Sequence, residues 1–140
     1  TREVPGLMMA LERGGSCLRL AYRLADADPF DQVLRLLARE TDDVRPTNVP
    51  RWLDLATPTG PLRALAFVAS PSGVNYAGRL APQVVAQTLA RAAGHWGSGA
   101  QYLHNTVVQL DAHGIRDRNL WVLQALVAGE IRSLALPRAA

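Results

Sequence analysis

The sequence predicts an α+β fold, with a mainly antiparallel sheet or small barrel in its first half and helices in its second half. Short segments with alternating apolar residues occur before residue 70, whereas three longer segments with helical periodicity follow residue 80. Strands and helices do not alternate along the chain as they would in a parallel βαβ sheet. The length of 140 residues and the hydrophobic fraction of 49% suit a single domain, residues 1–140, with a buried core.

The first expected element is a β-hairpin. Residues 6–11, GLMMAL, and residues 17–24, CLRLAYRL, flank the turn sequence ERGGS. One face of the second segment carries four apolar residues: Leu18, Leu20, Tyr22 and Leu24. Because side chains alternate between the two faces of a strand, we expect these four to contact the core.

A helix is expected next. Asp28 is a suitable N-cap, and Pro29 suits the first helical position. Spacings of three, four and three residues then link Phe30, Val33, Leu37 and Glu40. This spacing places Glu40 on the side of the helix that is expected to face the core.

A second strand pair and three helices complete the expected elements. Residues 51–56 and 62–69 alternate as half-buried strands and flank the turn sequence TPTGP. Helical periodicity covers residues 82–93, residues 101–113 and a segment from Asp117 to Leu136. Gly94 and Gly114 are expected to be the C-caps of the first two of these helices.

The composition argues against several classes of partner. The formal charge is +3, but all 15 basic residues are arginines and they are spread singly along the chain, so we expect no nucleic-acid partner. No apolar run approaches the roughly 20 residues that cross a bilayer, so we expect no membrane partner. The single cysteine, Cys17, cannot form an intramolecular disulfide, which fits a reducing compartment such as the cytoplasm.

The histidine spacing argues against a metal site. His95, His104 and His113 follow one another at intervals of nine residues. Two imidazoles reach one face of a helix at intervals of three or four residues, so no pair of these histidines is arranged as metal ligands.

Two interpretations of Glu40 remain open from the residues alone. In the first, Glu40 ends an apolar stripe at the negative end of the helix dipole, with Asp42 and Asp43 directly after it. A partly desolvated carboxyl group beside like charges suits acid–base catalysis. In the second, the helix frays at Ala38 and Glu40 points into water, as glutamates at helix ends usually do.

Six segments together cover nearly the whole chain: PGLMMALERGGSCLRLAYRL, ARE, PRWLDL, ALAFVA, NYAGRLAPQVVAQTLARAAG and QYLHNTVVQLDAHGIRDRNLWVLQALV. In order and spacing, these segments resemble the ChaC-like family of γ-glutamylcyclotransferases. The resemblance implies a small, mainly antiparallel β-barrel flanked by helices. It also implies an enzyme, a lyase of glutathione catabolism, that converts glutathione into 5-oxoproline and cysteinylglycine without a metal or an organic cofactor. We expect this enzyme to be a monomer.

The resemblance also implies roles for individual residues. The catalytic glutamate of the family matches Glu40, which would take a proton from the α-ammonium group of the substrate and return it to the departing peptide nitrogen. Tyr76, in NYAG, matches a tyrosine that is expected to bind the substrate, although a packing role for Tyr76 is equally open. Tyr102, in QYL, also matches, but its position at the start of an amphipathic helix favours packing.

The family begins with a strand and a Tyr-Gly-Ser-Leu loop that holds the γ-glutamyl end of the substrate, and the printed chain has no such residues before Thr1. We therefore expect an N-terminally truncated domain that is inactive by itself. The alternative is a non-catalytic module on the same fold that binds a small molecule or another protein.

Overall fold

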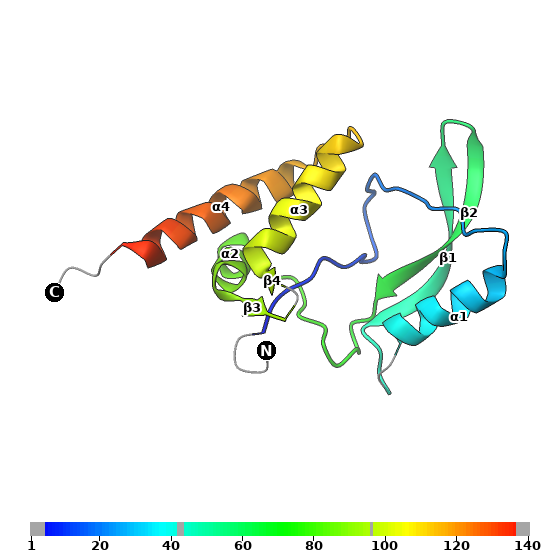
Figure 1. Cartoon of the computed structure of the whole chain (residues 1–140), viewed down its shortest axis with the longest axis horizontal. Helices are drawn as coiled ribbons and strands as arrows, with labels where there is room; N and C mark the ends of the chain where they lie inside the picture. The colour runs from blue at the N-terminus through cyan, green and yellow to red at the C-terminus, as the bar shows by residue number, and fades with distance from the viewer. Residues whose placement is uncertain (1–4, 42–43, 96, 137–140) are drawn as a thin grey trace. The chain divides into compact units, whose positions relative to one another are not determined.

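The computed structural model describes residues 5–41, 44–95 and 97–136. These residues form a mixed α/β structure in the order α1, β1, β2, α2, β3, β4, α3, α4 (Figure 1). Contacts divide the chain into two compact units. The first unit comprises Thr1–Met8 and Arg79–Ala140, and the second comprises Met9–Gly78. As predicted, β1 and β2 follow the first helix and precede the helices of the second half, but two short strands, β3 and β4, lie between α2 and α3.

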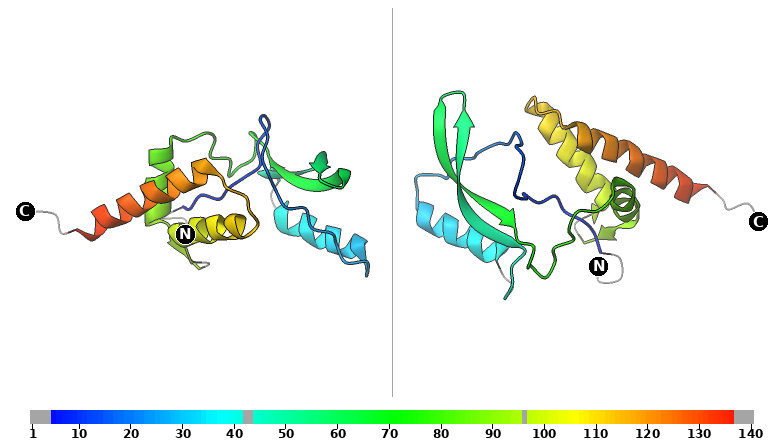
Figure 2. Two further views of the ribbon diagram at one scale, coloured as in Figure 1. Left: turned by 90° about the horizontal axis from the view of Figure 1, so that it is seen from above. Right: turned by 180° about the vertical axis from the view of Figure 1, so that it is seen from behind.

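The second unit is built on an antiparallel hairpin of β1, Asn48–Thr57, and β2, Gly60–Ala69. Thr57 and Gly60 are paired across the turn, and Gly60 has a φ of 119°, a backbone conformation that favours glycine. At the other end of the ladder, Asn48 is paired with Ala69. We call this end, formed by Asn48 and Ala69, the open end of the hairpin. Figure 2 shows the two strands as a twisted ribbon.

The first expected hairpin, residues 6–11 with residues 17–24, is wrong. Neither segment forms a strand, and the only pairing found for the described residues of this region is an isolated parallel bridge between Leu11 and Val68 of β2. Leu18 and Tyr22 are exposed rather than directed into a core. A strand requires a hydrogen-bonded neighbour, and alternation of apolar residues does not supply one. The chain bends within the expected turn sequence, where Gly14 and Gly15 both have positive φ.

Helix α1, Pro29–Glu40, agrees with the expected helix at both ends (Figure 1). The Asp28 carboxylate caps the helix by accepting a hydrogen bond of 3.1 Å from the backbone N–H of Asp31. Pro29 occupies the first turn, where its missing N–H has no consequence. The stripe is only partly buried, however, since Phe30 is exposed and no residue of α1 is fully buried.

The first unit contains α2, Pro82–Arg91, α3, Gly99–Ala112, and α4, Arg118–Ala135. Figure 2 shows these three helices beside one another. Their apolar faces meet in one small core, to which Leu7 also packs. The fully buried members of this core are Ala86, Leu89, Leu103, Val107 and Val127.

The expected C-cap at Gly94 is wrong, because α2 ends at Arg91 and its C-cap is Ala92. The Ala92 carbonyl accepts a hydrogen bond of 2.8 Å from the N–H of Gly99, which brings the start of α3 back to the end of α2. Gly94 instead belongs to β3, Ala93–Gly94, which pairs with β4, Gly97–Ser98. Gly114 follows the C-cap His113 with a φ of 70°, as expected for a glycine that ends a helix.

The two sheets of the described chain are separate, and each has two strands, so these residues form no closed barrel. The α+β class is confirmed at this coarser level. Among the described helices, none combines the length and the hydropathy that crossing a bilayer requires.

Candidate functional site

Glu40 is the last residue of α1, and the interpretation in which the helix frays at Ala38 is wrong. Thr41 closes the helix directly after it. Both the backbone N–H and the side-chain hydroxyl of Thr41 donate to the carbonyl oxygen of Leu37, at 2.9 and 2.6 Å. These two bonds give the Leu37 carbonyl oxygen two donors within the protein, whereas carbonyl groups at an uncapped helix end are hydrogen-bonded by water. The backbone of Glu40 is therefore held by the capped end of the helix.

The Glu40 side chain is 24% exposed and accepts hydrogen bonds at both oxygens. Asn48, at the open end of the hairpin, donates from Nδ2 to Oε2 at 3.1 Å. Arg39 donates from Nε to Oε1 at 3.0 Å, but the Arg39 side chain is 71% exposed. The Glu40 side chain is thus partly buried and contacts a residue of another element. Asp42 and Asp43, its expected acidic neighbours, lie outside the described residues.

The loop after β2 packs against the residues that lead into β1. Ser70 and Asn75 both donate backbone N–H groups to Thr47, Ser70 to the carbonyl at 2.7 Å and Asn75 to the hydroxyl at 3.0 Å. Val74 donates its N–H to the carbonyl of Arg45 at 3.1 Å. Gly73 lies so close to Thr47 that a Cβ atom at position 73 would overlap the Thr47 backbone. The loop and the segment before β1 therefore form one packed layer at the open end of the hairpin.

Tyr76 lies at the end of this loop and is half-buried. Its hydroxyl donates a short hydrogen bond to the Glu12 carboxylate. Glu12 reaches this position because the neighbouring Leu11 accepts a hydrogen bond of 2.6 Å from the N–H of Ala69, the register partner of Asn48. The Glu12–Tyr76 and Asn48–Glu40 contacts thus both belong to the open end of the hairpin.

The sequence interpretation missed two of these four residues, Glu12 and Asn48. Glu12 is the first residue of the expected turn sequence ERGGS, and Asn48 precedes an alternating segment in a loop-like stretch. Neither position carries a periodic or spacing signal. Only the pairing of distant segments brings them to Tyr76 and Glu40.

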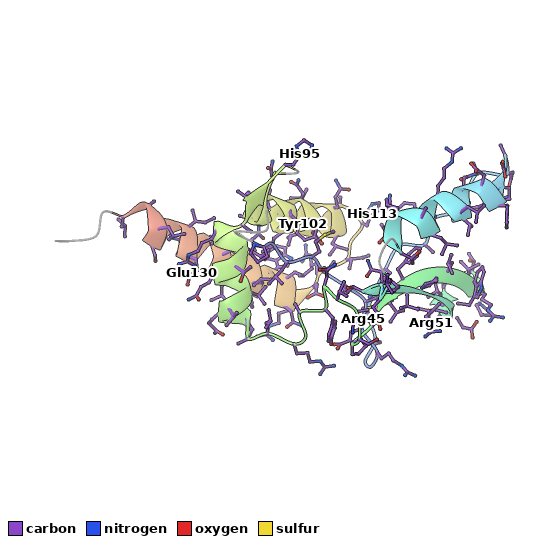
Figure 3. The ribbon with its side chains drawn as sticks, turned by 90° about the horizontal axis from the view of Figure 1, so that it is seen from below. Arg45, Arg51, His95, Tyr102, His113 and Glu130 are labelled. Atoms are coloured by element: carbon purple, nitrogen blue, oxygen red, sulfur yellow. The ribbon has the colours of Figure 1, made fainter. Side chains whose placement is uncertain are left out.

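The other candidate residues lie in the first unit. Tyr102 is a half-buried residue near the start of α3, and Figure 3 labels it together with His95 and His113. His104 accepts or donates a hydrogen bond of 3.1 Å with Gln124 of α4. His104 and His113 are separated by two and a half turns of α3, about 13 Å along its axis. In the part of the chain that is described, no three His, Cys, Asp or Glu side chains are grouped as metal ligands.

The amino-acid sequence of the chain matches a known protein family. The family model described as "ChaC-like protein" matches residues 1–130, which include elements of both units. A protein of Escherichia coli (strain K12) named "Glutathione-specific gamma-glutamylcyclotransferase" is 32% identical over 121 residues. The alignment covers 86% of this chain and 52% of that protein, so the chain spans about half the length of the curated relative that it matches.

Proposed function

Because the chain belongs to the ChaC-like protein family, we propose that the complete protein is a γ-glutamylcyclotransferase that acts on glutathione. The name of the Escherichia coli relative supports this substrate and reaction class. The products would be 5-oxoproline and cysteinylglycine. The observation that carries the proposal is the Glu40 carboxylate, which ends α1, is 24% exposed and is held by Asn48 from the neighbouring strand.

In the proposed reaction, Glu40 takes a proton from the α-ammonium group of the γ-glutamyl residue. The freed amine attacks the γ-carbonyl carbon of the same residue, a five-membered ring forms, and the bond from that carbon to the cysteine nitrogen breaks. Glu40 returns its proton to the departing nitrogen. In total the α-nitrogen loses two protons and the departing nitrogen gains two, so no net proton is consumed when both free amines are protonated. Because the attack is intramolecular, the protein has to provide mainly a folded substrate pose and one proton carrier.

Tyr76 is proposed to bind the substrate. Its hydroxyl donates to Glu12, so the phenol oxygen would act as the acceptor in a hydrogen bond with the substrate. The α-ammonium and the amide N–H of glutathione can donate such a bond. A phenol whose proton is held by a carboxylate is thus suited to accept a hydrogen bond from the substrate.

We also propose that the two units belong to one domain and that the β1–β2 hairpin is part of a larger, barrel-like sheet in the complete protein. The family match supports the first point, since it runs through both units. The isolated parallel bridge between Leu11 and Val68 supports the second, because it places the backbone of Leu11 beside β2, where a further strand would lie. A cytoplasmic monomer without a nucleic-acid partner remains the expectation from the sequence.

Release of 5-oxoproline from glutathione by the complete protein tests this proposal, with γ-glutamyl-alanine as a comparison substrate. Glu40→Gln should lower kcat by about 100- to 10,000-fold, the usual contribution of general acid–base catalysis. Glu130→Gln is the matched control, since Glu130 lies on α4 of the other unit, 3.8 Å from Arg91. If glutathione remains intact but binds, the non-catalytic module is the correct interpretation. Full activity of Glu40→Gln would remove Glu40 from the mechanism.

A further inference from the structure

We propose that Asn48 is the positioning residue of the reaction, and that it fixes Oε1 of Glu40 as the oxygen that exchanges protons with the substrate. This inference rests on the proposed function of Glu40. It assigns a role to a residue that neither the sequence pattern nor the comparisons point to.

The contact between Asn48 and Glu40 joins two elements. Asn48 is the first residue of β1 and Glu40 is the last residue of α1, and the hydrogen bond from Nδ2 to Oε2 is 3.1 Å long and partly buried. Arg39 contacts the other oxygen but is exposed and directly precedes Glu40 in the helix. Exposed ion pairs contribute little, and adjacent residues of a helix do not face one another. Asn48 is therefore the partner that determines how the carboxyl group is oriented.

Asn48 is suited to this role because its own backbone is fixed on both sides. Its register partner Ala69 is 6% exposed and donates a further hydrogen bond to Leu11. The preceding residue, Thr47, accepts hydrogen bonds from Ser70 and Asn75. A short side chain on a fixed backbone loses little conformational entropy when it forms a contact, whereas a long arginine side chain loses more.

The side-chain amide of Asn48 determines which carboxylate oxygen of Glu40 exchanges protons with the substrate. The Asn48 NH₂ group only donates, and it does not change its protonation in the accessible pH range. A proton on Oε1 leaves Oε2 as the carbonyl oxygen, which is the stronger acceptor for the Asn48 donor, whereas a proton on Oε2 turns that oxygen into a hydroxyl, a weaker acceptor. Proton transfer is therefore assigned to Oε1, where the substrate would displace the contact of Arg39, whose side chain is 71% exposed.

Three variants of the complete protein test the proposal, with kcat and KM measured for 5-oxoproline release from glutathione. Asn48→Ala should lower kcat by about 10- to 100-fold, the effect of losing one hydrogen bond to a charged group. The proposed role of Asn48 is to hold Glu40 rather than the substrate, so the KM of this variant should stay close to that of the wild type. Asn48→Asp has the shape of asparagine without the donor, and should be at least as slow as Asn48→Ala. Asn105→Ala, an exposed position of α3, is the control and should leave both parameters unchanged.

The relative kcat values of Asn48→Asp and Asn48→Ala distinguish a positioning role of Asn48 from a role in which its side chain only fills space. If Asn48 only fills space, Asn48→Asp keeps the activity of the wild type and Asn48→Ala loses it. That result, or an unchanged kcat in Asn48→Ala, overturns the inference while the proposed function stands. A wild-type protein that releases no 5-oxoproline refutes the proposed function, and the positioning role with it.

Discussion

Replacement of Gly73 by alanine should separate the loop that carries Tyr76 from the segment before β1. An added Cβ atom would lie 2.8 Å from Oγ1 and 2.9 Å from the backbone nitrogen of Thr47, and would overlap its Cα. Ordinary contacts between heavy atoms are about 4 Å, so the loop must move by about 1 Å or more. Gly73 does not have a positive φ in this structure, so alanine can adopt its backbone conformation and the effect arises from the contact alone.

The magnitude follows from what the loop loses when it moves. Val74 and Asn75 donate the backbone hydrogen bonds of 3.1 and 3.0 Å to Arg45 and Thr47. If the loop moves and both hydrogen bonds are lost, the cost is about 1–3 kcal/mol in total. If the loop stays in place and both bonds are kept, the steric strain of the added methyl group costs about as much. We expect Gly73→Ala to lower the free energy of unfolding by about 1–3 kcal/mol. The KM for glutathione should rise as well, because Tyr76 is displaced with the loop.

Gly129→Ala is the matched control for this prediction. Gly129 lies within α4, and an added Cβ atom would meet nothing within 4 Å. Alanine is favoured over glycine in helices, so this variant should gain about 0.5–1 kcal/mol. Urea unfolding followed by circular dichroism on the complete protein measures both changes. If Gly73→Ala is as stable as the wild type, the close approach of Gly73 to Thr47 does not hold the loop and the reasoning is wrong.

Three further predictions concern the helical core around Gly99, the hydroxyl of Tyr76 and the N-cap of α1. Gly99→Ala should reduce stability by about 1–3 kcal/mol in the same unfolding assay, because its Cβ atom would lie 2.8 Å from the carbonyl oxygen of Leu89 in the helical core. Tyr76→Phe should raise the KM for glutathione, with Tyr22→Phe as an exposed control, and an unchanged KM would leave Tyr76 with a packing role. Asp28→Ala should lower the unfolding free energy by about 1 kcal/mol through loss of the α1 cap, whereas Asp28→Asn should retain most of it; equal losses would argue against a capping role.

Local patterns determined the elements whose stabilising contacts lie close together in the sequence. The N-cap Asp28, the proline after it and the apolar spacing that follows determined α1 and placed Glu40 at its end, and the structure agrees. The turn sequence between residues 51–56 and 62–69 determined the hairpin in the same way. Helices and tight hairpins can be predicted because their hydrogen bonds join residues a few positions apart.

The tertiary structure alone determined which segments pair with or pack against these elements. Residues 17–24 alternate as well as the residues of β1 do, yet they form no strand, because alternation does not specify a neighbour. Asn48 and Glu12 have no signal in the sequence, but long-range pairing brings the first to Glu40 and the second to Tyr76. The sequence therefore determined where the carboxylate lies along α1, whereas the packing at the open end of the hairpin determined which groups it contacts.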